Sequence, residues 1–224
     1  MPQEAQTTFD NRKATATLKN YVSRSIEAMS GMIFRKPMST IGYSQDMEDM
    51  FESVDLHSTL NQFSRELSSM LIRDGKVNVL VDSSDDADKP YFIMVTRLEL
   101  INWKKDINGN FTLAVIKELA DDTVGIYETR RVEQYRVYDE NGNITIYRKD
   151  ERTQEFIEHQ RIVTDVDYIP LVEFDLLDIP PMYDIAKLNI KHMNRTSVKD
   201  RYLDMAACPV PVIWGANLDE DGGT

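Results

Sequence analysis

The sequence predicts an α+β fold in which amphipathic helices pack on antiparallel β-hairpins and a long helix follows. Apolar residues recur at intervals of three and four in two N-terminal segments, which is the spacing of a helix with one buried face. The turn-forming string Asn-Gly-Asn occurs twice between segments of strand character. A further segment of helical spacing follows Pro180 and Pro181. With 42% hydrophobic residues among 224, the chain can form a sizeable core.

The first predicted helix extends from Ala14 to Ile33, and Pro37 disfavours helical geometry soon after its end. Residues 38–57 have no regular pattern, so we expect mostly loop there, with a short turn of helix around Met47 to Glu52. The apolar stripe of the first helix consists of Leu18, Val22, Ile26, Met29 and Ile33.

A second helix is predicted between Ser58, which can cap its start, and Gly75, which lies just past its end. It leads directly into Val77 to Val81, a β-branched stretch typical of a buried strand. The apolar face of this helix consists of Leu60, Phe63, Leu67, Met70 and Leu71.

Short strands and turns are predicted after this unit. The acidic run Asp82 to Lys89 indicates a loop, and Tyr91 to Thr96 indicates the next strand. The stretch Leu98 to Trp103 either continues that strand or turns. Later in the chain, Arg161 to Val166 and Leu171 to Phe174 are predicted as short strands.

Two hairpins are predicted at Asp106 to Asn110 and at Asp139 to Asn143, because Asn-Gly favours a two-residue type I′ turn. The first turn precedes a strand at Phe111 to Leu119. Around the second turn, the alternation of a half-buried ribbon is expected from Tyr135, Val137, Ile144, Ile146 and Arg148.

The last predicted helix extends from Met182 to Ala207 and would be about 40 Å long at ~1.5 Å per residue. Pro209 and Pro211 end it, Val210 to Trp214 can begin a strand, and the acidic, glycine-rich residues 219–224 indicate an exposed loop. Basic residues alternate with apolar ones along this helix: Lys187, Lys191, Arg195, Lys199 and Arg201.

Composition excludes several classes of protein. The net charge of -12 opposes tight, sequence-independent binding to phosphates, so a basic DNA-binding domain is not expected. The basic stretch Asn11 to Pro37 can meet an acidic neighbour or form a solvated helix face. No segment is apolar enough to span a bilayer, and Cys208 has no second cysteine to pair with.

The sequence offers no catalytic, cofactor-binding or metal-binding constellation. His57, His159 and His192 lie far apart, and no phosphate-binding loop, nucleophile elbow or dinucleotide fingerprint occurs. The two Asp-x-Asn-Gly-Asn strings do not fit the calcium-binding loop of an EF-hand. Their glycine is the fourth residue of the string rather than the sixth of the loop, and predicted strands flank both strings. We therefore expect no enzyme activity and no cofactor.

The order of segments resembles the portal proteins of tailed bacteriophages, and the strongest match is Pro180 to His192 continuing to Cys208 to Gly215. The aromatic and basic pair usual after the histidine of that motif is Met193-Asn194 here. The other matching blocks are Tyr21 to Met29 with Gly31 to Pro37, Leu60 to Leu67 with Asp74 to Asp82, Pro90 to Phe92, and Ile101 to Trp103.

The resemblance implies a portal-like wing followed by the first stem helix. The expected parts are an N-terminal helix and irregular arm (1–56), an α+β wing (57–179), a long stem-like helix (180–208) and the start of a clip-like region (209–224). A portal would continue through the rest of its clip, a second stem helix, a tunnel loop and a crown.

The resemblance also implies function, partners and location. A portal is a ring, typically dodecameric, through which genomic DNA is packaged and ejected. Its partners would be other copies of itself, the major capsid protein, head-completion adaptor or tail proteins, the terminase large subunit and transiently bound, non-specific double-stranded DNA, with no membrane. It would occupy the virion's portal vertex, and the host cytoplasm during assembly. The alternatives are another head-tail adaptor or tail component and, less favoured, a nucleic-acid-processing enzyme.

Four basic residues of the last helix are the candidate contacts for oligomer formation or for the channel: Lys187, Lys191, Arg195 and Lys199. A ring requires head-to-tail contacts between two different faces of each subunit. These side chains either pair with acidic residues, face the channel, or simply solvate the helix.

Overall fold

The computed structural model describes residues 5–83, 87, 89–124, 128–150 and 153–207. It is a mixed α+β structure with antiparallel sheets, as the sequence predicts. The chain divides into two compact units, Ser23–Tyr183 and the combination of Met1–Val22 with Asp184–Thr224, here called the body and the helical unit. The predicted division into four parts stays a prediction.

Thirteen helices and strands are formed by the described residues. The helices are α1 (Gln6–Thr15), α2 (Tyr21–Ile33), α3 (Gln45–Glu52), α4 (Leu60–Asp74) and α5 (Tyr183–Ala207). The strands are β1 (Lys76–Asp82), β2 (Tyr91–Thr96), β3 (Leu100–Lys105), β4 (Phe111–Val124), β5 (Glu128–Tyr138), β6 (Ile144–Lys149), β7 (Phe156–Ile162) and β8 (Leu171–Asp175).

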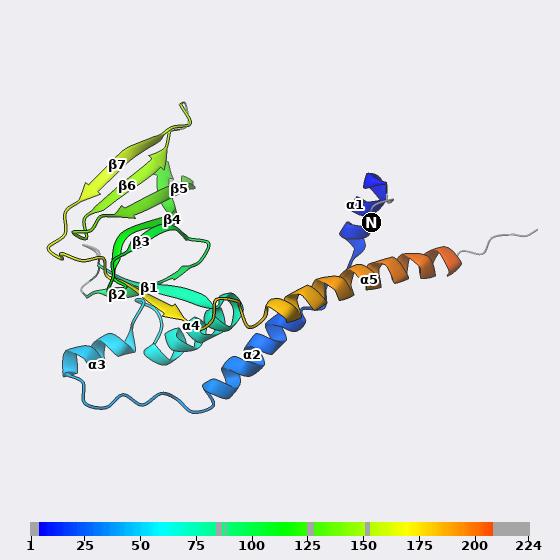
Figure 1. Ribbon diagram of the computed structural model, residues 1–224, viewed down its shortest axis with the longest axis horizontal. Coiled ribbons are helices and arrows are strands. Elements are labelled where there is room, and N and C mark those ends of the chain that lie inside the picture. Colours follow the sequence, from blue (N-terminus) through cyan, green and yellow to red (C-terminus); the bar gives the residue numbers. More distant parts are fainter. Residues whose placement is uncertain (1–4, 84–86, 88, 125–127, 151–152, 208–224) are drawn as a thin grey trace, which may run out of the picture. The chain divides into compact units, whose positions relative to one another are not determined.

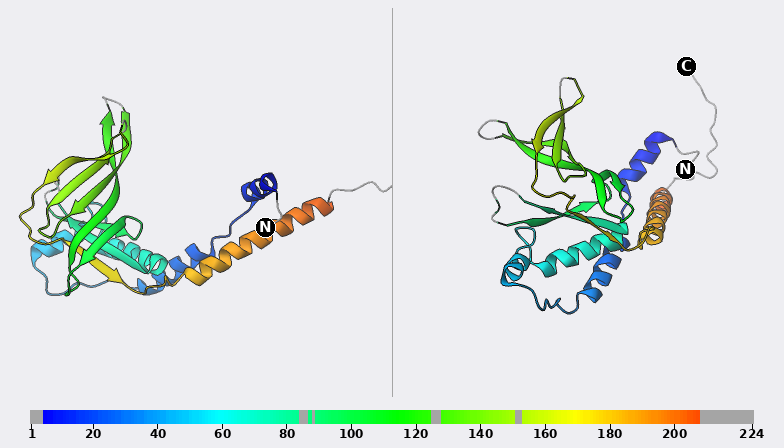
Figure 2. Two further views of the ribbon diagram at one scale, coloured as in Figure 1. Left: turned by 45° about the horizontal axis from the view of Figure 1, so that its top comes forward. Right: turned by 60° about the vertical axis from the view of Figure 1, so that its left-hand side comes forward.

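The body contains two antiparallel sheets and a helix in three layers. One sheet has the strand order β2-β1-β8 and the other the order β3-β4-β5-β6-β7. Figures 1 and 2 show α4 against one face of the smaller sheet and the larger sheet on its other side. Because β1 is the central strand and is covered on both faces, it forms the middle of the body.

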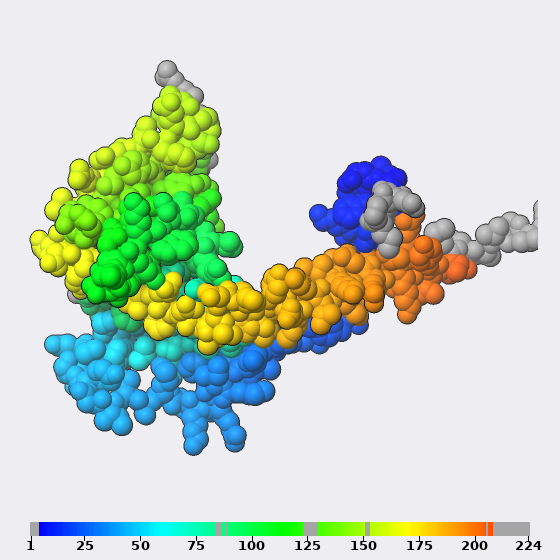
Figure 3. All heavy atoms as spheres, viewed as in Figure 1, coloured from blue at the N-terminus to red at the C-terminus, as the bar shows by residue number. Residues whose placement is uncertain are grey.

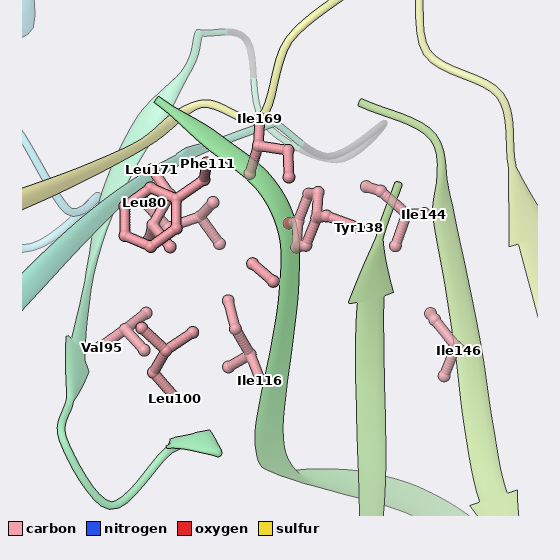
Figure 4. Close-up of a cluster of buried hydrophobic side chains, with 11 residues drawn as sticks. Leu80, Val95, Leu100, Phe111, Ile116, Tyr138, Ile144, Ile146, Ile169 and Leu171 are labelled. Atoms are coloured by element: carbon pink, nitrogen blue, oxygen red, sulfur yellow. The ribbon is translucent and has the colours of Figure 1, made fainter. Parts of the chain in front are cut away.

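Alternate residues of β1 point into two separate clusters. Val79 packs with Phe63 of α4 and with Val54, whereas Leu80 faces the larger sheet. Figure 4 shows the second cluster, in which Phe111, Ile116 and Tyr138 meet residues of the smaller sheet. Its buried members are Leu80, Val95, Leu100, Phe111, Ala114, Ile116, Tyr138, Ile144, Ile146, Ile169 and Leu171.

Local signals placed several elements correctly. The short helix expected around Met47 to Glu52 is α3, and Tyr91–Thr96 is a strand with the predicted bounds. The second predicted helix is α4, although its N-cap is Thr59 rather than Ser58. The side chain of Thr59 accepts a hydrogen bond from the Gln62 backbone N–H, and Gly75 ends the helix with φ +80°.

The prediction of one N-terminal helix from Ala14 to Ile33 is wrong. Two helices, α1 and α2, are separated by residues 16–20. The residue after α1, Ala16, is extended, with φ -65° and ψ 129°. The apolar spacing continues through this break to Leu18, so spacing alone predicted one helix. The Leu18 side chain is in fact about half exposed.

The predicted type I′ turns are also wrong, although both hairpins form. In each loop only the glycine has a positive φ, +88° at Gly109 and +75° at Gly142, whereas a type I′ turn requires two such residues. The Asp106 carboxylate accepts hydrogen bonds from the Asn108 and Asn110 backbone N–H groups. This side chain stabilises a longer loop that ends in a left-handed glycine.

The later strands differ from prediction in position. The strand expected at Arg161 to Val166 lies earlier, at β7, and Val163 is exposed beyond its end. The stretch from Leu98 is a turn followed by β3, and β4 continues past Leu119 to Val124. The expected strand at Val210 to Trp214 lies outside the described residues.

Candidate subunit interface

The four candidate residues of α5 lie along a single ridge. Lys187, Lys191, Arg195 and Lys199 follow one another every fourth residue, so their side chains form one row that is inclined to the helix axis. All four are exposed. Lys187 has an interaction partner, whereas no interaction with another described residue is present at the other three. We call these four residues the basic ridge.

Large apolar side chains lie beside the basic ridge. Leu188 is 64% exposed and Tyr202 is 68% exposed, and their spacing from Arg195 and Lys199 places them next to the row. Figure 3 shows one face of α5 as yellow to orange spheres. A row of cations with exposed apolar neighbours is compatible with a contact surface.

Another face of α5 is used within the helical unit. Arg12 of α1 is buried, and its Nη1 donates a hydrogen bond of 3.0 Å to Ser197 Oγ. Ser197 in turn donates to the Asn194 carbonyl oxygen at 2.9 Å. Asn189 is also buried on this helix. Because these contacts lie away from the basic ridge, α1 leaves the ridge exposed.

Charge is distributed unequally between the two units. Residues 1–22 and 184–224 contain eight basic and eight acidic side chains, which gives a net charge of 0. Residues 23–183 contain 18 basic and 30 acidic side chains, which gives a net charge of -12. The basic ridge therefore belongs to a unit without net charge, and the body carries the net negative charge of the chain.

Arg136 of β5 lies at the centre of a group of interacting charged side chains in the body. Its Nη1 lies 2.6 Å from Asp82 Oδ2 and its Nε lies 3.2 Å from Glu118 Oε1. Burial lowers the pKa of the guanidinium, but Tyr138, Glu118 and Asp82 outweigh this effect and raise it. Burial also raises the pKa of Tyr138 to about 12, against the opposing influence of Arg136.

This charged group corrects the predicted alternation of β5. The residues that face the smaller sheet are Arg136 and Tyr138, opposite Ile146 and Ile144, rather than Tyr135 and Val137. The carboxylates of Asp82 and Glu118 compensate the arginine, so the buried face of this strand accommodates a charge. The group links the two sheets and is a structural feature of the body.

Metal clusters and membrane-spanning helices are absent from the described part of the chain. It contains no group of three or more histidine, cysteine, aspartate or glutamate side chains arranged to hold a metal. Its helices include none that is both long and apolar enough to cross a bilayer. In the described acidic loop only Asp82 interacts with a charge, and it belongs to β1. The basic ridge is therefore the best candidate for a functional surface.

Sequence reasoning found the basic ridge because its spacing is local. It missed a groove beside α3, because that groove depends on side chains from three separate segments. The Arg136 group was missed for the same reason. In comparisons with known proteins, no family model and no curated protein matches the chain.

Proposed function

We propose that the chain is a structural, non-enzymatic subunit of a phage portal ring, the connector between head and tail through which genomic DNA passes. In this proposal the body is the wing and α5 is the first stem helix. The single observation that carries the proposal is the basic ridge with its exposed apolar neighbours. Such a surface on a 25-residue helix is suited to contact with another subunit.

Charge differs between the surfaces that a head-to-tail contact would join. Head-to-tail assembly joins two different faces of identical subunits. The basic ridge carries four cations and the body carries the net negative charge of the chain, and opposite charges steer association and fix its register. Two identical faces of one sign would repel each other.

The charge also suits a passage for DNA. A wall that binds phosphates tightly would hold the duplex, and the affinity of a protein for DNA grows with the number of phosphates it neutralises. A net charge of -12 keeps such contacts few. In this proposal duplex DNA is a transient and non-specific partner.

The remaining proposed partners and location follow from the same role. A portal contacts other copies of itself, the major capsid protein, head-completion adaptor or tail proteins and the terminase large subunit. It is assembled in the host cytoplasm and occupies the portal vertex of the virion. The proposed ring is dodecameric.

Negative-stain electron microscopy of the intact purified protein tests this proposal. The expected result is rings of uniform diameter with an open centre and about twelve-fold symmetry. Compact particles without a channel would contradict it and favour a different head-tail adaptor or tail component. Divalent-metal-dependent cleavage of DNA by the pure protein would instead favour an enzyme.

A further inference from the structure

The body contains a groove beside α3 that combines apolar side chains with two carboxylates. The groove has a volume of about 290 Å³ and lies between α3, the arm before it and the start of α4. Met38, Phe51 and Leu60 provide apolar walls, and Glu48 and Glu52 provide two carboxylates. A hydrogen bond of 2.9 Å from the Met38 backbone N–H to Asn61 Oδ1 connects the arm to α4.

The groove is acidic and has no basic residue of its own. Residues 38–56 contain five acidic and no basic side chains. Glu48 and Glu52 are one helical turn apart and have no interaction with another described residue. Although Lys89 donates from its Nζ to the Asp49 carbonyl oxygen in the last turn of α3 at 2.8 Å, the carboxylates of Glu48 and Glu52 have no cation of their own among the described residues. A cation from outside would therefore be stabilised here.

Exposed apolar side chains surround the groove as they do the basic ridge. Ile41 is 87% exposed, and Tyr43 and Met47 are each nearly half exposed. The ring of Tyr43 packs edge-on against Phe51, with 5.1 Å between the ring centroids. The arm and α3 therefore carry exposed apolar side chains, and Tyr43 contacts the groove residue Phe51.

We propose that the basic ridge of one copy binds the groove beside α3 of a second copy. Both surfaces repeat their charges at one helical turn, every fourth residue, so neighbouring cations such as Lys191 and Arg195 match Glu48 and Glu52 in spacing. Leu188 and Tyr202 meet the apolar walls. This inference rests on the proposed ring and names its subunit contact.

The contact is heterologous, because the ridge and the groove are different surfaces. Each copy offers its ridge to one neighbour and its groove to the other, so the contact propagates and closes into a ring if the rotation allows. The charges steer encounter and set the register, while the apolar side chains contribute through burial.

Charge reversal in two separate chains tests this contact. One variant is K191E/R195E and the other is E48K/E52K. Each alone is expected to weaken self-association at least tenfold, measured by sedimentation velocity over a range of concentrations. An equimolar mixture of the two variants is expected to recover assembly, because each reversed surface then finds an opposite one on the other chain.

Matched control variants change the same charges elsewhere. K13E/K19E alters two exposed lysines of the helical unit, and E155K/E158K alters two exposed glutamates of the body. Both controls are expected to assemble like the wild type. Circular dichroism of every variant checks that it is folded, and the recovery in the mixture shows that the single variants retain functional surfaces.

The outcomes separate this contact from the proposed function. If both variants form the same rings as the wild type, the proposed contact is wrong and the portal proposal still stands. Variants that lose assembly without recovery in the mixture also overturn the contact, since they indicate a different pairing of surfaces. A wild-type protein that stays monomeric at every concentration overturns both.

Discussion

Arg136 Nη1 lies 2.6 Å from Asp82 Oδ2, and this ion pair connects the last residue of β1 to β5 in the other sheet. The same guanidinium reaches Glu118 of β4 through its Nε. On the face of the larger sheet that packs against the smaller sheet, apolar side chains are therefore followed by charged ones at Arg136 and Glu118. The two sheets of the body are joined by hydrophobic packing, by the Arg136 group and by an ion pair between Lys105 of β3 and Glu173 of β8.

Replacing Arg136 with methionine is expected to destabilise the body by about 3 kcal/mol, because Asp82 and Glu118 would be left without their cation. Urea unfolding followed by circular dichroism measures the change. Arg131→Met is the matched control, since its side chain is 77% exposed and pairs with Asp121 at 3.6 Å. A loss of less than about 1 kcal/mol for Arg136→Met would contradict the assigned role.

Gly109 and Gly142 occupy equivalent positions in the two hairpin loops and form a natural comparison. A Cβ at Gly109 meets open space, so Gly109→Ala is expected to cost only the ~1 kcal/mol of a positive φ. A Cβ at Gly142 would lie 2.5 Å from the Val166 carbonyl oxygen and 2.6 Å from that of Tyr168. Gly142→Ala is therefore expected to cost at least about twice as much. Equal melting temperatures of the two variants would contradict this reading.

The Asp139 carboxylate is expected to stabilise the second hairpin in a pH-dependent way. Burial raises its pKa, but hydrogen bonds from Asn143 and the Asn141 backbone N–H outweigh burial and lower it. The unfolded chain therefore takes up this proton first as the pH falls through about 4. The stability that the ionised Asp139 carboxylate contributes at neutral pH is lost as the pH falls through the lowered pKa that this group has in the folded state.

Comparing wild type with Asp139→Asn measures this contribution. The difference in unfolding free energy is expected to be present at pH 7 and to shrink as the pH falls below about 4. Parallel stability curves for the two proteins over this range would contradict the assignment. Chemical denaturation at a series of pH values provides the data.

Sequence predicted those parts of the fold that depend on neighbouring residues. The end of α4 at Gly75 and the buried strand after it follow from local chemistry, whereas the cap is Thr59, one residue after the predicted Ser58. The basic ridge was predictable for the same reason, since its residues share one helix.

Features that depend on distant residues were not predictable. Tyr135 was expected on the buried face of β5 because it is less polar than Arg136. Arg136 lies on that face instead, because Asp82 and Glu118 compensate its charge. The helix α1 has no apolar stripe, so periodicity gave no signal for it. The groove beside α3 requires Met38 and Leu60 to meet across more than twenty residues.

The molar mass of the intact protein in solution tests the central claim most directly. Light scattering at low ionic strength is expected to give one discrete mass equal to many chains, independent of concentration over a wide range. Because opposite charges contribute to the contact, that mass is expected to fall toward smaller species as salt approaches about 0.5 M. The mass of a single chain at every concentration and at low salt would contradict the account.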